Sequence, residues 1–213
     1  MSSDLFVARS TDQVCHELLL GLAGRLPDEL LWRLRDWLAA QSRAALAATL
    51  PRELLRHRIG LTETECELLA TATGEWGASR RLLDAVLPVE TPDRPATDFG
   101  DAPVDVDGAA LSVLAVVRGH PGCRELLHAR RGAVVAAGSR AARPDQRVVL
   151  VRGGERPWVL TGTLQRLLRA HGDRTPCVEV LPPHKEPPAY HQAAIIGSAP
   201  LWRSTAMAAP AGT

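Results

Sequence analysis

The pattern of apolar positions along the first 88 residues is helical throughout. Apolar side chains recur three and four positions apart in several runs, separated by capping residues and glycines. Thr62 followed by Glu65 forms a capping box, which marks a helix start, and Ser42 breaks or re-caps the chain before residues 43–50. Pro51 suits the first turn of a helix and is expected to open a short one. The pattern predicts about five helices, which begin near Asp12, Pro27, Pro51, Thr62 and Ala78.

Short apolar runs organise residues 147–181. The run from Val148 to Val151 is too continuously apolar for a strand with one wet face, so we expect a strand buried on both sides. Gly153 and Gly154 supply the positive φ angles of a tight turn. The pattern therefore predicts a hairpin of two strands, Arg147–Arg152 and Pro157–Leu160. A helix over residues 162–170 and a third strand, Cys177–Leu181, complete the unit.

The rest of the second half has weaker periodicity. Residues 109–119 form either a helix or a buried strand, residues 123–131 indicate a helix, and residues 133–138 indicate a short strand. The proline-rich residues 182–188 cannot pair as a central strand and are expected to wrap a sheet edge in extended form. Residues 189–202 predict one last strand or short helix.

Together these patterns predict an α+β protein, in which an N-terminal all-α helical module precedes a small antiparallel or mixed α+β sheet module. The helical module spans residues 1–88 and the sheet module residues 109–202. Residues 89–108 are rich in Pro and Asp and lack apolar periodicity, so we expect a linker. The tail, residues 203–213, is expected to be disordered.

The net charge of +1 hides an asymmetry between the halves. Residues 1–108 hold 11 basic and 18 acidic residues, whereas residues 109–213 hold 14 basic and 6 acidic ones. Opposite charges favour self-association between the acidic and basic halves, within one chain or head to tail between chains. Lys185 is the one lysine, and the many Arg, Ala, Pro and Gly residues are typical of a GC-rich genome. Arginine abundance is therefore a weaker sign of nucleic-acid binding than usual.

The sequence also indicates the cellular location of the protein and the redox state of its cysteines. No apolar run approaches the ~20 residues of a membrane helix, and the N-terminus lacks the plan of a signal peptide. We therefore expect a cytoplasmic protein without a membrane partner. The cysteines, Cys15, Cys66, Cys123 and Cys177, are far apart in sequence, which favours free thiols over disulfides or a zinc ribbon.

Motifs for catalysis, metals and cofactors are weak. His120, Cys123 and His128 lie within nine positions, but a structural zinc site needs four ligands and no partner pair stands out. The Gly153-Gly154 pair matches neither a phosphate loop nor a dinucleotide fingerprint. We therefore expect no catalytic residue, metal or cofactor. An enzyme would have to use Cys123, Cys177 or the His184–His191 loop.

The favoured hypothesis is a non-catalytic regulatory or adaptor protein that binds another protein. Small helical modules joined to a second module are often interaction elements, an association based on fold class. Trp32 and Trp76 are possible anchors, because tryptophans dominate many interfaces. His184, Lys185 and Tyr190 lie on a proline-rich loop, and loops often carry function.

Nucleic-acid binding is the alternative hypothesis. An arginine face in the second half would neutralise phosphates and give salt-dependent binding. The chain has a single Tyr, no aromatic interleaving for base stacking and no convincing helix-turn-helix, all of which weigh against it. The candidate arginines are Arg118, Arg130, Arg131, Arg140, Arg143 and Arg152.

Overall fold

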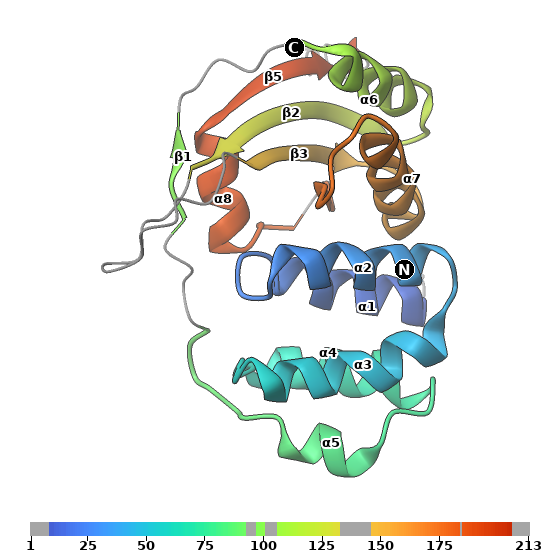
Figure 1. The fold of residues 1–213 in the computed structure, drawn as a ribbon, viewed down its shortest axis with the longest axis vertical. Helices are drawn as coiled ribbons and strands as arrows, with labels where there is room; N and C mark the ends of the chain where they lie inside the picture. The colour runs from blue at the N-terminus through green and yellow to red at the C-terminus, as the bar shows by residue number, and fades with distance from the viewer. Residues whose placement is uncertain (1–8, 93–96, 101–105, 133–145, 184, 206–213) are drawn as a thin grey trace, which may run out of the picture.

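The structure, a computed structural model, describes residues 9–92, 97–100, 106–132, 146–183 and 185–205. Within these residues it has eight helices and five strands. The helices α1–α5 come first in the chain, and all strands follow them (Figure 1). This order confirms the α+β class expected from the sequence.

Helices of the first part stack in layers beneath the sheet, α1 and α2 next to it and α3 and α4 beyond them (Figure 1). Thr62 and Glu65 form the expected capping box at the start of α4. Ser10, not Asp12, caps α1 by accepting a hydrogen bond from the Gln13 amide at 3.2 Å. The helices are α1 (Thr11–Gly21), α2 (Asp28–Ala39), α3 (Arg43–Arg56), α4 (Glu63–Gly74) and α5 (Arg80–Ala85).

The prediction that Pro51 opens a separate helix is wrong. Pro51 lies inside α3, which runs without a break from Arg43 to Arg56. An interior proline costs ~3 kcal/mol in a helix. Leu46, Leu50 and Leu54 nevertheless keep one fully buried face across it, and burying three leucines outweighs that cost.

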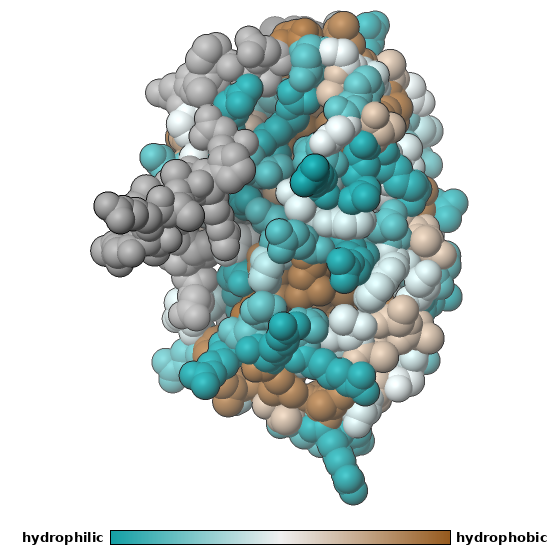
Figure 2. Space-filling model, viewed as in Figure 1, coloured by the Kyte–Doolittle hydropathy of each residue, from teal (hydrophilic) through white to brown (hydrophobic). Residues whose placement is uncertain are grey.

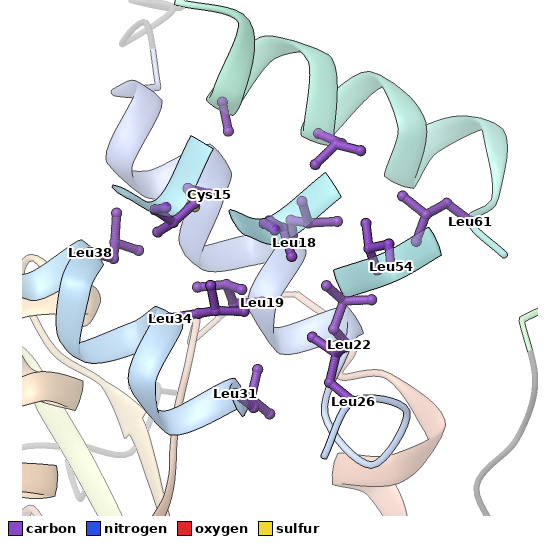
Figure 3. Close-up of a cluster of buried hydrophobic side chains, with 14 of the residues drawn as sticks. Cys15, Leu18, Leu19, Leu22, Leu26, Leu31, Leu34, Leu38, Leu54 and Leu61 are labelled. Carbon is purple, nitrogen blue, oxygen red and sulfur yellow. The ribbon is translucent and has the colours of Figure 1, made fainter. Parts of the chain in front are cut away.

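Leucines from four helices fill the core of the helical layers. In Figure 3, Leu18 of α1 and Leu22, which follows that helix, point toward Leu54 of α3, and Leu19 lies against Leu34 of α2. The same cluster includes Trp158 and Tyr190 from the second half of the chain. Residues of α7 (Pro157–Ala170) and α8 (Ala189–Ile196) therefore contribute to the core of the helical layers.

The sheet is mixed and centred on β2. Strand β2 pairs antiparallel with β3 on one side and with β5 and β1 on the other. Strands β3 and β4 are parallel and are joined by the crossover helix α7 (Pro157–Ala170). The strands are β1 (Phe99–Gly100), β2 (Cys123–Arg131), β3 (Gln146–Gly153), β4 (Cys177–Leu181) and β5 (Ser198–Arg203).

Two predicted elements have the wrong secondary structure: one predicted strand is a helix, and one predicted helix is a strand. Residues 157–160 are the first turn of α7 and not a hairpin strand, because Pro157 stands at the helix start, where proline fits without losing a hydrogen bond. Residues 123–131 form β2 and not a helix. Leu126, Leu127, His128 and Ala129 are all buried because both faces of the strand are covered, which removes the alternation that marks a strand.

For the segments whose secondary structure the sequence left open, the structure shows which alternative is present. Residues 109–119 lie in a helix, α6 (Gly108–Gly119), which Asp107 caps. Residues 189–202 contain both a helix, α8 (Ala189–Ile196), and strand β5. The strand expected over residues 133–138 lies outside the described residues, as do residues 206–213 of the tail. The segment expected as a linker contributes β1 and the cap of α6.

Helices cover both faces of the sheet. Residues of α6 and α7 pack on the face that carries Leu126, Val149 and Val178. Leu20 of α1 and Ala194 of α8 pack on the other face. In Figure 2, hydrophilic residues cover much of the visible surface, with apolar patches among them. Among the described helices, none has the length and apolar character that crossing a bilayer requires.

Candidate functional site

A groove of about 840 Å³ lies between the first part of the chain and the segment after β4. We call it the proline-walled groove. Its helical wall comes from α1 and α4 and includes Gln13, Glu17, Leu20, Thr64, Glu65 and Leu68. Its other wall comes from residues 181–188, together with Pro157 at the start of α7. The groove therefore brings together segments from both halves of the sequence.

Five prolines give the second wall its character. Proline has no N–H to donate and holds the chain extended, so this wall offers ring faces and carbonyl oxygens. The prediction that this segment does not pair as a central strand is confirmed, because the described residues of 182–188 belong to no helix or strand. The lining contains no Phe, Tyr or Trp. The prolines are Pro157, Pro182, Pro183, Pro187 and Pro188.

Charged residues at the rim are paired with one another. Glu17 accepts hydrogen bonds from Arg9, at 3.1 Å, and from Lys185. Glu65 accepts one from Arg25 at 2.6 Å, beside its capping bond to the Thr62 amide. Because cations and carboxylates neutralise each other here, the rim does not select strongly for a charged ligand.

His16 lines the groove from α1 and is only 3% exposed. Its Nε2 lies 2.9 Å from the carbonyl oxygen of Val180. A carbonyl can only accept, so Nε2 carries the proton and Nδ1 holds a lone pair. Burial lowers the pKa of His16 to about 4, which makes the ring neutral at pH 7. Nδ1 has no hydrogen-bond partner among the described residues.

Behind His16 lies a buried ionic cluster. Arg35 of α2 donates two hydrogen bonds of 2.7 Å to the carboxylate of Glu179 in β4. His191 of α8 is completely buried, and its Nε2 lies 2.8 Å from the same carboxylate. Burial alone would raise the pKa of Glu179, but Arg35 and His191 hold it near 2. The cluster fixes α2, α8 and β4 to one another and so positions the groove.

Sequence reasoning did not identify this cluster, although the sequence carries a signal for it. Arg35 stands on the apolar face of its helix, four positions after Leu31 and next to Leu34. Glu179 stands in the middle of an apolar strand. A charge inside each of two apolar patterns is rare unless the charges are paired, and the two have opposite signs.

The residues expected to bind a partner do not form one site in the structure. Lys185 is exposed at the rim of the groove, and His184 lies outside the described residues. Trp32 and Trp76 are half-buried, and each has a guanidinium group over its ring, Arg169 at 4.3 Å and Arg43 at 5.7 Å. Neither presents a bare ring to a partner.

Tyr190 belongs to α8 and not to a loop. It is 6% exposed, its ring packs edge-on against Phe99, and its hydroxyl accepts a hydrogen bond from Arg131 at 3.1 Å. Burial raises the pKa of this hydroxyl above its usual range. Tyr190 therefore supports the core beside the sheet.

The candidate arginines that the structure describes differ in exposure and in pairing. Arg118 is exposed, whereas Arg130 is half-buried. Arg131 pairs with Asp28, and Arg152 lies 3.8 Å from Glu125. Arg140 and Arg143 lie outside the described residues.

The structure gives the cysteines no activating surroundings. Burial raises the pKa of Cys123 to about 11, although His120 Nδ1 lies 3.7 Å from its sulfur. Burial also raises the pKa of Cys15, Cys66 and Cys177. Nucleophilic cysteines have lowered pKa values, so these thiols are poor candidates. Among the described residues, no group of three or more His, Cys, Asp or Glu could hold a metal ion.

The turn at Gly153 and Gly154 leads from a strand into a helix, as phosphate-binding turns do. The amides of Gly154 and Glu155, however, donate to the carbonyls of Gly122 and Pro121, both at 3.0 Å. These amides are therefore not available to hold a phosphate.

Comparison of the chain with protein-family models, with curated proteins and with solved structures finds no match.

Proposed function

We propose that this protein is a regulatory or adaptor component that binds an extended segment of another protein in the proline-walled groove. The groove itself is the observation that supports the proposal most strongly. It has a volume of about 840 Å³, and its proline-rich wall follows directly on β4, which the buried pair of Glu179 with Arg35 joins to α2. A wall that is held in place before binding lowers the entropic cost of binding.

The chemistry of the walls indicates what the partner carries. Recognition of proline-rich segments elsewhere pairs proline rings with aromatic side chains. Here the prolines belong to the groove, and its described lining holds no Phe, Tyr or Trp. The partner segment therefore supplies the aromatic residue, which lies between the proline wall and Leu68 of α4. The balanced charges at the rim suit a segment of low net charge.

Thr64 and Thr71 offer a matched pair of positions to test the proposal. Both are exposed residues of α4, but only Thr64 lines the groove. The photo-crosslinking amino acid p-benzoylphenylalanine, placed at Thr64 in the source cell, should capture a protein segment that contains an aromatic residue. The same probe at Thr71 should not capture that segment.

A synthetic peptide of the captured segment then tests the groove directly. Thr64→Trp fills the groove and should weaken peptide binding at least tenfold, whereas Thr71→Trp should leave it unchanged. Replacing the aromatic residue of the peptide with Ala should weaken binding similarly. No crosslink at Thr64, equal crosslinks at both positions, or normal binding by Thr64→Trp would each refute the proposal.

A further inference from the structure

A second hollow, of about 490 Å³, meets the proline-walled groove at Pro183. We call it the arginine hollow. Its lining consists of Arg124, Glu125, Arg152, Pro183, Arg203 and Ser204. Three guanidinium groups thus surround one carboxylate, which leaves a surplus of two positive charges.

The sheet register creates this arrangement. Glu125 of β2 stands opposite Arg152 of β3 on one side and opposite Arg203 of β5 on the other. Arg203 donates from Nε to Glu125 at 2.7 Å, while Arg152 stays 3.8 Å away, beyond hydrogen-bond distance. Among the described residues, Arg124 has no ion pair. Within the part of the chain that the structure describes, the terminal nitrogens of the three arginines therefore donate no hydrogen bond and remain for another acceptor, although Arg152 is within ion-pair distance of Glu125.

The position of the hollow in the fold favours a ligand. Arg152 is the second-last residue of β3, and Pro183 follows the end of β4 by two residues. β3 and β4 are parallel and joined by α7, and in open sheets built from such parallel units ligands bind beyond the carboxyl ends of the strands. The hollow lies at that end.

We propose that the arginine hollow binds the phosphate group of a phosphate monoester. The planar fork of a guanidinium matches phosphate oxygens in two-point contacts, and a dianion balances the two surplus charges. Among the residues that the structure describes, the hollow has no aromatic lining that would stack a base, so recognition centres on the phosphate group. The site does not depend on the proline-walled groove and extends beyond the proposed function.

The test follows the arginine side-chain NMR signals of the full chain during titration with inorganic phosphate and with O-phosphoserine, at constant ionic strength. We expect saturable shifts for Arg152 and Arg203. Arg152→Gln removes one charge-assisted contact and should weaken binding about tenfold. Glu125→Gln removes the competing carboxylate and should tighten binding.

Arg118→Gln is the matched control, since Arg118 is exposed on α6 and lies outside the hollow. It should leave the affinity unchanged. A preference for O-phosphoserine would identify a phosphorylated side chain as the source, and equal affinities a small phosphate compound. Shifts without saturation, binding of inorganic phosphate alone, or equal losses in Arg118→Gln and Arg152→Gln would overturn the proposal. Tighter binding of a 20-base-pair DNA duplex, weakened by Arg118→Gln, would instead favour a nucleic-acid face.

Discussion

Single buried polar side chains determine how this protein responds to acid. His16 is enclosed by Arg35, Glu179 and His191, and burial keeps its ring neutral. His128 is completely buried on β2, and its pKa is lowered to about 4 by burial and by Arg147. Both histidines would have to gain a charge inside the core for the folded protein to bind the proton.

We therefore expect the free energy of unfolding to fall as the pH drops from 6.5 to 4. An unfolded histidine binds a proton near pH 6.5, whereas folded His16 binds one only near pH 4. The unfolded state is thus favoured progressively across this window, by roughly 3 kcal/mol per buried histidine. Above pH 6.5 the full stability is present. Urea titrations at pH 7, 6, 5 and 4 would measure the loss.

His16→Gln is the control for this prediction. It keeps a side-chain N–H donor for Val180 but cannot titrate, so its stability should fall by only about half as much over the window. Glu179 affects the free energy of unfolding at a lower pH than the histidines do, because its pKa is depressed to about 2. Its stabilisation is present above pH 4.5 and is lost as the pH falls toward 2. Equal losses in His16→Gln and the natural protein would contradict the assignment.

Secondary-structure elements differed in how far their sequences specified them. The capping box at Thr62 is a local signal, and α4 begins there as predicted. The type of β2 was not predictable from periodicity, because helices cover both its faces and the four consecutive residues from Leu126 to Ala129 are all buried. The start of α7 was misassigned because the two glycines before Pro157 suit a hairpin and a strand-to-helix turn equally well.

The crossing of α2 and α7 depends on a glycine. A Cβ at Gly162 would lie 2.3 Å from the Cβ of Ala39, so the two helices touch closely at this point. Gly162→Ala gains about 1 kcal/mol of helix propensity, but overpacking costs about 1–3 kcal/mol. We expect net destabilisation, measured as a lower melting temperature.

Ala39→Gly should partly rescue Gly162→Ala, because it removes the atom that the new methyl group meets. Gly74→Ala provides the control, since a Cβ at Gly74 meets nothing within 4 Å. That variant should be neutral or slightly stabilising. If Gly162→Ala is as stable as Gly74→Ala, the helices are not in contact as described.

The two halves of the molecule pack together through contacts that net charge only partly predicted. Arg131 pairs with Asp28, and Arg166 with Asp36 at 3.0 Å, as expected for a basic second half and an acidic first half. The buried pair has the opposite polarity, since Arg35 belongs to the acidic half and Glu179 to the basic one. Net charge reports on the surface, whereas the buried pair depends on the positions of two individual residues.

A double-mutant cycle tests whether this pair joins the halves. Arg35→Met or Glu179→Leu alone leaves a buried charge unpaired and should cost about 3–5 kcal/mol. The double variant removes both charges and should cost clearly less than the sum of the single variants. Urea unfolding curves of the four proteins measure the coupling free energy between Arg35 and Glu179. The exposed pair Arg80 and Asp84, 4.0 Å apart, should show negligible coupling in a parallel cycle. Additive costs for Arg35 and Glu179 would mean that this pair does not join the two halves.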